Sequence, residues 1–239
     1  SPAAGTGLSS HELNQPGCYR DVKDTTCTAQ FKVIGEDNLY FLAWTTTPWT
    51  LPSNTALCVG PNITYVKVKS SNPYTGVPAT YIVAKDLVGK LFSEKIPFEV
   101  LPGEMKGSEL VGMRYEQLIP WFRPDEGAFR VIPGDYVSTE EGTGIVHIAP
   151  TFGADDAKVA KAAGVPGLVV IDRNGDPQAQ VDPRGRFYRV EDLDPEYVKE
   201  RVSDEYREWA GRYVKNAYDD SLPADAPTLD VDLCVMMKS

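Results

Sequence analysis

The chain has 239 residues, of which 42% are hydrophobic and 24% are charged, and its formal net charge is −10. This length suits one large domain with a substantial core. The negative charge argues against broad, sequence-independent nucleic-acid binding, which depends on neutralising phosphates. No apolar run approaches the roughly 20 residues that cross a membrane, and the first ten residues lack the build of a signal peptide. We therefore expect a cytoplasmic protein without membrane contact.

The four cysteines, Cys18, Cys27, Cys58 and Cys234, are widely scattered, and none forms a C-x-x-C pair. Such spacing disfavours a zinc site. A disulfide framework is also disfavoured at this chain length and cysteine density. We expect reduced thiols and no metal.

The first half of the chain predicts short strands, because its many prolines and glycines imply frequent turns. Residues 1–17 are predicted to form a flexible lead-in, and residues 18–239 a single domain. Residues 29–34 and 39–45 predict a hairpin. Other predicted elements are strands at residues 55–59, 65–69, 81–84 and 98–101, and a short helix over residues 86–92. The stretch 102–134 is interrupted by four prolines, and no element is assigned there.

The second half predicts longer elements. Residues 142–150 read as a buried strand that is entered through a glycine turn, and residues 153–163 as a helix with acids in its first turn, which suits the helix dipole. Apolar residues at helical spacing predict one long helix over residues 195–218. Residues 219–239 are expected to wrap back over the body. The sum is a strand-rich α/β domain, a curled sheet or barrel with peripheral helices.

A threonine-rich segment follows the apolar run 39–44. Thr45, Thr46, Thr47 and Thr50 place four hydroxyl groups within six residues. Each threonine offers one donor, two acceptor lone pairs and a methyl group. Such a run suits the wall of a small polar pocket better than a core strand.

His147 lies within the apolar strand, and Asp155 and Asp156 follow after Pro150 at the start of the next helix. A lone histidine in such a strand is commonly a core residue, and adjacent acids are commonly a helix cap and a surface charge. Strand ends beside helix starts are nevertheless frequent ligand positions in α/β folds. Because neither a G-x-S-x-G elbow nor a phosphate-binding loop is present, the residues favour a pocket that orients water and substrate.

The two motifs together are similar to a known family. Residues 45–56 resemble the threonine-rich segment of the editing domain of isoleucyl-tRNA synthetases, and residues 142–156 resemble its second editing motif. Residues 19–22 resemble the entry into this insertion, connective peptide 1. The resemblance covers essentially the whole chain. Both signatures of the synthetic site, of the His-Ile-Gly-His and Lys-Met-Ser-Lys-Ser types, are missing from the sequence, so we expect an excised insertion that edits but does not aminoacylate.

The resemblance implies hydrolytic proofreading of valine esterified to the 3′ acceptor end of tRNA(Ile), with valyl adenylate as a second substrate. The discrimination of isoleucine from valine is itself the established example of this limit, because one methylene contributes only about 1–3 kcal/mol to binding. A second, hydrolytic site is therefore needed to remove the smaller product. No cofactor is implied for editing, since ATP and magnesium serve only the synthetic site. The remainder of the synthetase is the expected protein partner, and the isolated domain is expected to be a monomer.

Residue roles follow from the resemblance. Asp156 would hold the substrate ammonium, and His147 would contact the terminal ribose hydroxyls and limit the pocket size. Thr45, Thr46 and Thr47 would line the site around the ester and a positioned water. The weaker candidates for substrate contact are Trp49, Thr50 and Asn54. Asp155 is assigned to the helix start.

Three alternatives remain at the level of the sequence. The same pocket would also suit a non-catalytic module that binds the aminoacylated acceptor end of the tRNA. A free-standing editing factor would carry the same motifs. An unrelated small-molecule hydrolase is the third alternative.

Overall fold

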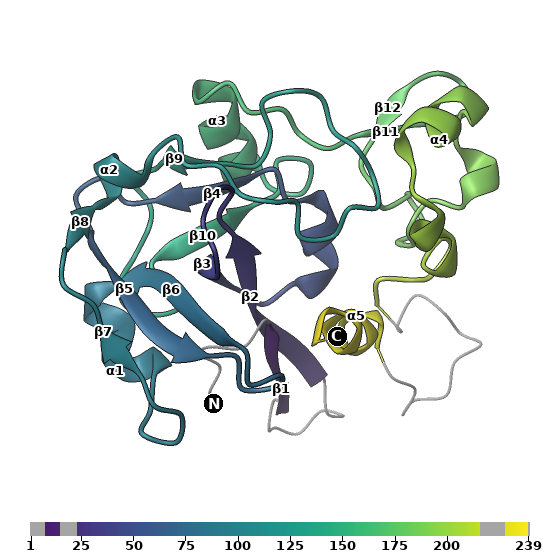
Figure 1. The fold of residues 1–239 in the computed structure, drawn as a ribbon. Helices are drawn as coiled ribbons and strands as arrows, with labels where there is room; N and C mark the ends of the chain where they lie inside the picture. Colours follow the sequence, from purple (N-terminus) through teal and green to yellow (C-terminus); the bar gives the residue numbers. More distant parts are fainter. Residues whose placement is uncertain (1–7, 15–22, 216–227, 239) are drawn as a thin grey trace.

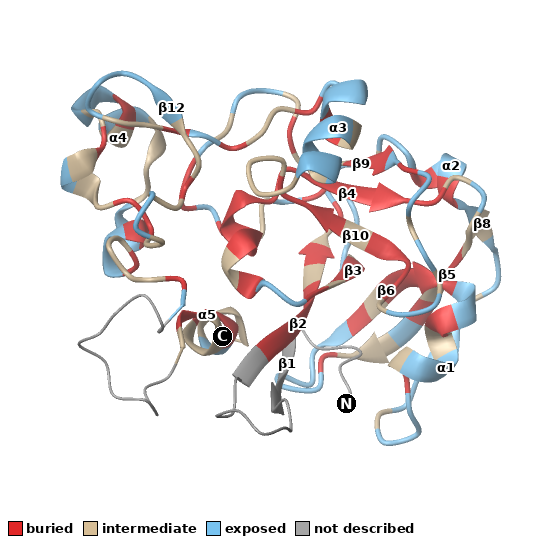
Figure 2. Ribbon diagram, turned by 180° about the vertical axis from the view of Figure 1, so that it is seen from behind, coloured by how far each residue is buried: buried red, intermediate tan, exposed pale blue. Residues whose placement is uncertain are grey.

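The computed structural model describes residues 8–14, 23–215 and 228–238. The fold is a mixed α/β arrangement of several sheets with few and short helices, as the sequence predicts. Figure 1 shows the sheets at the centre and α4, β11 and β12 at the end opposite α1 and β7. The buried residues are concentrated in the central strands and in η1 (Pro48–Ser53), whereas α1 (Val88–Leu91), α3 (Ala154–Ala162) and α4 (Pro195–Arg201) are mainly exposed or half-buried (Figure 2).

The largest sheet has seven strands in the order β1-β2-β3-β6-β5-β7, with β8 also paired to β5. Its strands are β1 (Leu8–Asn14), β2 (Lys23–Lys32), β3 (Leu39–Thr45), β5 (Thr64–Ser71), β6 (Pro78–Ala84), β7 (Glu99–Val100) and β8 (Met105–Lys106). The predicted hairpin is confirmed, because β2 and β3 pair antiparallel with Phe31 opposite Phe41. Only β3 and β6 pair in parallel within this sheet.

A second sheet of three strands carries the strand predicted to hold the histidine. Its central strand is β4 (Ala56–Val59), antiparallel to β10 (Ile145–Ile148) and parallel to β9 (Arg130–Pro133). All four residues of β4 are buried. The third sheet is the pair β11 (Val170–Ile171) and β12 (Pro177–Gln178).

The helical segments are short. They are η1 (Pro48–Ser53), η2 (Lys85–Leu87), α1 (Val88–Leu91), α2 (Gly107–Leu110), α3 (Ala154–Ala162), η3 (Val190–Asp192), α4 (Pro195–Arg201), η4 (Asp204–Glu208) and α5 (Leu229–Lys238). Helix α5 packs against β1 and η1, so the predicted return of the C-terminal segment over the body is confirmed for its described part. No helix in the described ranges is long and apolar enough to cross a bilayer.

The prediction of one helix over residues 195–218 is wrong. Helix α4 ends at Arg201 because Val202 is extended, with φ −110° and ψ 126°, and bridges to Phe122. The chain then continues as η4, whose Tyr206 is buried with its ring centroid 4.4 Å from that of Phe122. The apolar residues of this stretch are therefore buried by two separate segments instead of one helix. Tertiary packing overrides the helical periodicity of the sequence. Residues 216–218 lie outside the described ranges.

Two other predictions need correction. Strand β1 lies inside the predicted lead-in 1–17, where the structure pairs it with β2; residues 1–7 and 15–17 fall outside the described ranges. The predicted helix over 86–92 is divided into η2 and α1, and Asp86 does not cap it, since the chain enters η2 at Ala84.

The described cysteines, Cys27, Cys58 and Cys234, are buried and form no disulfide with one another. Cys18 is outside the described residues.

Candidate functional site

The two sequence motifs meet at one hollow. Strand β4 follows almost directly on η1 and pairs with β10, so that His147 lies opposite Leu57. The N–H of Thr55 extends this pairing by donating to the carbonyl of Ile148 at 3.0 Å. The threonine-rich segment is thereby brought beside the histidine strand. The hollow has a volume of about 260 Å³ and is lined by Trp44, Thr45, Thr46, Thr47, Thr50, Val146, His147, Ala149, Phe152 and Asp156.

The threonine wall is shaped by the end of β3 and the start of η1. Pro48 stands in the first turn of η1, where its missing N–H is not needed. Thr45 is buried and accepts a hydrogen bond from the N–H of Thr47 at 3.0 Å. The hydroxyl of Thr50 donates to the carbonyl of Thr47 at 2.8 Å. Thr46 and Thr47 are exposed, so the wall combines two fixed hydroxyls with two accessible ones.

His147 is held on both sides of its ring. Its Nε2 lies 3.0 Å from the hydroxyl of Thr50, and its Nδ1 lies 2.8 Å from the side-chain nitrogen of Asn54. Burial lowers the pKa of His147 to about 4, so the ring is neutral at neutral pH. A neutral ring with both nitrogens engaged is poorly suited to take a proton from water. Direct contact of His147 with ribose hydroxyls stays a prediction.

Asp156 provides the carboxylate of the hollow. It stands in the first turn of α3, and its Oδ2 accepts the backbone N–H of Ala149 at 3.0 Å. Burial raises the pKa of Asp156, the hydrogen bond from Ala149 opposes that shift, and the nearby Asp155 adds to it. Asp155 is exposed and does not line the hollow, which agrees with its assignment to the helix start.

A glycine turn sets the position of β10. Gly144 has φ +81°, and a Cβ built there would lie 2.4 Å from the Cβ of Ala84. The preceding residue, Thr143, accepts the N–H of Ala84 at 2.9 Å and donates its hydroxyl to the carbonyl of Leu42 at 2.5 Å. The start of β10 therefore docks closely on β3 and β6, and this contact aligns His147.

Asn54 and Trp49 lie behind the pocket wall, which corrects their expected place among the substrate-contacting residues. Asn54 is 2% exposed and bonds to His147, and it accepts the hydroxyl of Tyr115 at 2.5 Å. Trp49 packs edge-to-face on Phe152, with ring centroids 5.0 Å apart. Both residues therefore support groups that line the hollow.

The sequence interpretation missed four lining residues. Trp44, Val146, Ala149 and Phe152 supply the apolar part of the wall. Each lies within one of the two motifs or next to it, so their position in the sequence could have marked them as candidates. Tyr115 lies in the stretch 102–134, where no signal was available.

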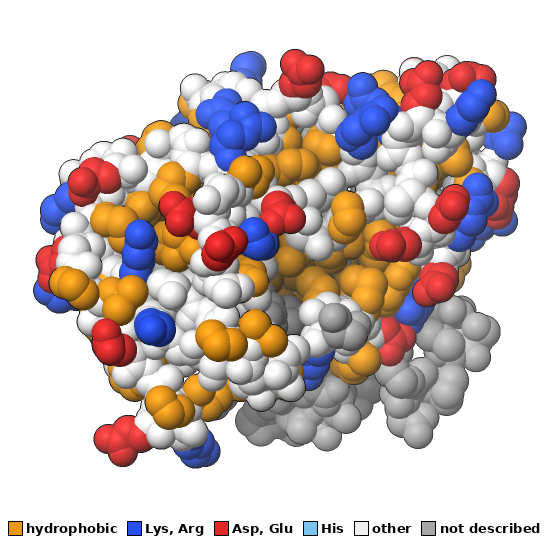
Figure 3. Space-filling view, viewed as in Figure 1, with side chains coloured by type: hydrophobic (Ala, Val, Ile, Leu, Met, Phe, Trp, Pro, Cys, Tyr) orange, Lys and Arg blue, Asp and Glu red, His pale blue; other side chains and the backbone are white. Residues whose placement is uncertain are grey.

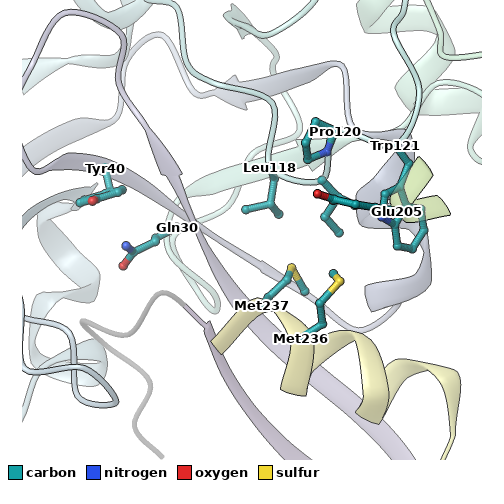
Figure 4. Close-up of a pocket in the computed structure, with 9 residues that line it drawn as sticks. Gln30, Tyr40, Leu118, Pro120, Trp121, Glu205, Met236 and Met237 are labelled. Atoms are coloured by element: carbon teal, nitrogen blue, oxygen red, sulfur yellow. The ribbon is translucent and has the colours of Figure 1, made fainter. Parts of the chain in front are cut away.

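A larger hollow of about 310 Å³ lies between the main sheet and α5 (Figure 4). Glu205 is its one carboxylate, and the remaining wall is mainly apolar, with Leu118, Met236 and Met237 facing it. It lacks the combination of hydroxyls, imidazole and carboxylate found at the first hollow, which is therefore the candidate site. Among the described residues, no group of three or more His, Cys, Asp or Glu side chains is placed to hold a metal ion.

Comparison with known proteins identifies the family of the chain. No family model matches the chain. The isoleucine–tRNA ligase of Bacteroides fragilis is 59% identical over the whole chain, which covers 23% of that protein. The chain belongs to the isoleucine–tRNA ligase family.

Other members of the isoleucine–tRNA ligase family show the same relationship. The ligase of Porphyromonas gingivalis is 56% identical over the whole chain, again covering 23% of that protein. The ligase of Thermoplasma volcanium is 42% identical over 92% of the chain and 18% of its own length. The chain thus spans less than a quarter of the length of these relatives.

Among solved structures, the editing domain of the P. falciparum cytosolic leucyl-tRNA synthetase is similar to part of the chain. The TM-score is 0.41 at 18% identity, and the match covers 50% of this chain and 44% of that one.

Proposed function

We propose that this site hydrolyses the ester that joins valine to the 3′-terminal adenosine of tRNA(Ile). The observation that carries the proposal is the half-buried carboxylate of Asp156, which lines the same hollow as the hydroxyls of Thr45, Thr46 and Thr47. The lining of this hollow combines one carboxylate with several hydroxyl groups. That combination suits a substrate with an ammonium group close to an ester.

The chemistry assigns a distinct task to each part. Asp156 binds the α-ammonium through a charge-assisted contact, which is stronger than a neutral hydrogen bond. The threonine hydroxyls orient a water whose oxygen attacks the ester carbonyl. The bond from the carbonyl carbon to the ribose oxygen breaks, and that oxygen takes up a proton, which releases valine and the free RNA end. Valyl adenylate is a second substrate, in which attack by water breaks the bond from the carbonyl carbon to the phosphate oxygen and releases valine and AMP.

The volume of about 260 Å³ suits a small ligand. Pockets for drug-sized ligands occupy roughly 300–1,000 Å³, so this hollow suits a small side chain. The apolar residues Trp44, Val146 and Phe152 face such a side chain.

The partners proposed for this chain are the acceptor end of tRNA(Ile) and the remainder of the synthetase. Figure 3 shows basic and acidic side chains interspersed on one face, with no continuous basic field. With a net charge of −10, the chain has little means of neutralising many phosphates. The rest of the synthetase is therefore proposed to supply most of the contact with the tRNA.

The test is hydrolysis of valyl-tRNA(Ile) by this chain and by the full-length synthetase that contains it. Asp156→Asn, which keeps the shape and removes the charge, is expected to lower the rate by about 100-fold or more. Asp155→Asn is the matched control, because the neighbouring carboxylate is exposed and does not line the hollow. Equal rates for the two variants would refute the assignment. Binding of the charged tRNA by the wild type without hydrolysis would indicate a non-catalytic module.

A further inference from the structure

We propose that Tyr115, which does not line the pocket, acts through Asn54 as a positioning residue that holds His147 in one neutral tautomer, with the proton on Nε2. As a consequence, the hydroxyl of Thr50 has no free proton and can only accept hydrogen bonds from groups beside it. The consequence for the substrate rests on the proposed editing function. The tautomer itself does not.

The orientation of the Asn54 amide is decided by a backbone carbonyl. The side-chain Nδ2 of Asn54 lies 2.9 Å from the carbonyl oxygen of Ala56. A carbonyl oxygen only accepts hydrogen bonds, and the opposite amide orientation would place two oxygens against each other. The hydroxyl of Tyr115 donates to Oδ1 at 2.5 Å and satisfies the other side of the amide. Because Asn54 and Tyr115 are 2% and 1% exposed, bulk water does not replace either bond.

The protonation of the His147 ring follows from the orientation of the Asn54 amide. The second hydrogen of the Asn54 Nδ2 points to Nδ1 of His147 at 2.8 Å, so Nδ1 is an acceptor. A neutral imidazole with an accepting Nδ1 carries its proton on Nε2. That N–H donates to the hydroxyl oxygen of Thr50 at 3.0 Å. The pKa of about 4, lowered by burial, keeps the ring neutral at neutral pH.

The chain of hydrogen bonds ends at a second backbone carbonyl. The hydroxyl of Thr50 lies 2.8 Å from the carbonyl oxygen of Thr47, which also only accepts. The proton of Thr50 is therefore engaged, and its oxygen receives the N–H of His147. Thr50 retains one lone pair, and the hydroxyl of Thr47, whose oxygen is 3.3 Å away, is placed to donate to it.

The resulting wall selects the polarity of the group that binds to it. A ligand atom next to Thr50 must donate a hydrogen bond, as a ribose hydroxyl or a water does. An ester carbonyl oxygen placed there would face a second acceptor. Under the proposed function, Thr50 therefore binds a hydroxyl group of the substrate, which takes the place of the Thr47 hydroxyl 3.3 Å away, while the exposed Thr46 is available to the ester.

The test is the nitrogen NMR spectrum of the histidine rings in the ¹⁵N-labelled protein. His147 and His11 are the two histidines of the chain, and His147→Gln identifies the signals of interest. At neutral pH we expect His147 to show a protonated Nε2 and an unprotonated Nδ1. In Asn54→Asp the ionised carboxylate only accepts hydrogen bonds, so once it is ionised the proton is expected to move to Nδ1.

Tyr115→Phe removes one hydroxyl and leaves the ring packing in place. It is expected to shift the His147 signals toward a mixture of tautomers. It is also expected to lower kcat for valyl-tRNA hydrolysis by about three- to tenfold, with KM unchanged, as the loss of one hydrogen bond implies. The matched control is Tyr206→Phe, because the buried hydroxyl of Tyr206 donates to a backbone carbonyl away from the site, that of Tyr188 at 2.5 Å. This control should leave the spectrum and kcat unchanged.

Two results overturn the inference: a wild-type ring protonated on Nδ1, or a folded Tyr115→Phe variant that matches Tyr206→Phe in spectrum and kcat. The wild-type spectrum decides the tautomer even where Tyr115→Phe does not fold. If the spectra agree but no form of the protein hydrolyses valyl-tRNA, the proposed function fails and the tautomer stands. If hydrolysis depends on Asp156 but the ring is protonated on Nδ1, the tautomer fails alone.

Discussion

The carboxylate of Asp156 accepts a hydrogen bond from the backbone N–H of Ala149 at 3.0 Å, which ties the first turn of α3 to the end of β10. Within the described part of the chain, the other carboxylate oxygen, Oδ1, has no hydrogen-bond partner. The residue is thus fixed by one oxygen and available through the other. An ammonium group can bind it without displacing the contact that holds it in place.

The first prediction concerns the acid limb of the editing reaction. Only the ionised form of Asp156 binds an ammonium, and burial raises the pKa of this carboxyl above its usual value. We expect kcat/KM for valyl-tRNA to fall as the pH drops through this raised pKa, above the value near 4 of an ordinary aspartate. The profile is measured between about pH 4 and 7. Asp155→Asn should still show this fall in kcat/KM at acid pH. If Asp156→Asn shows the fall at the same pH as the wild type, another group is responsible for it.

The second prediction concerns stability and pH. The pKa of His147 is about 4 in the folded protein, against 6.5 as its ordinary value, so the unfolded chain binds more protons between these values. The free energy of unfolding is therefore expected to rise with pH in this window. As the pH falls from 6.5 to about 4, His147 alone should lower it by about 3 kcal/mol. Urea unfolding of the wild type and of His147→Gln measures the difference. Parallel pH dependences for the two proteins would contradict the assignment.

The third prediction concerns the size of the pocket. His147→Ala and Thr47→Ala enlarge a wall of the hollow, and isoleucine exceeds valine by one methylene. We expect hydrolysis of isoleucyl-tRNA(Ile) to increase by about tenfold or more, since one methylene corresponds to roughly 10–200-fold in discrimination. Thr80→Ala, on β6 and outside the hollow, is the control. Unchanged rejection of isoleucine in both pocket variants would argue against selection by size at these residues.

The fourth prediction separates close approach from backbone conformation. Gly144→Ala places a Cβ 2.4 Å from that of Ala84 and forces a side chain into φ +81°. Gly175→Ala requires a similar φ of +83° but meets no atom within 4 Å. The control is expected to lose about 1 kcal/mol of unfolding free energy, and Gly144→Ala clearly more, with reduced editing because β10 shifts. Equal losses in thermal or urea unfolding would show that the close approach is unimportant.

The part of the site that the sequence predicted is local to two motifs. Thr45 and His147 could be singled out because hydroxyl clustering and a histidine in an apolar strand are visible along the chain. Their meeting depends on the pairing of β4 with β10, which joins residues about 90 positions apart. No periodicity in the sequence encodes that pairing, so before the structure only the family resemblance indicated a shared site.

The buried support of the site was invisible for a related reason. Tyr115 lies in a proline-broken stretch without a regular pattern, and its link to Asn54 spans 61 positions. A single buried hydrogen bond of this kind leaves no local signature in the sequence. The same limit explains the error over residues 195–218, where the bridge between Val202 and Phe122 ended a helix that the apolar spacing favoured.

The hydrogen-bond chain through His147 begins and ends on main-chain oxygens, those of Ala56 and Thr47. Amino-acid replacement changes side chains but leaves every residue with a carbonyl group. Substitution of Ala56 or Thr47 therefore leaves both terminal acceptors in place as long as the backbone follows the same path. The donor-to-acceptor direction of these hydrogen bonds is then unchanged. Evolution could retune the width of this pocket by side-chain exchange while its donor and acceptor pattern stayed constant.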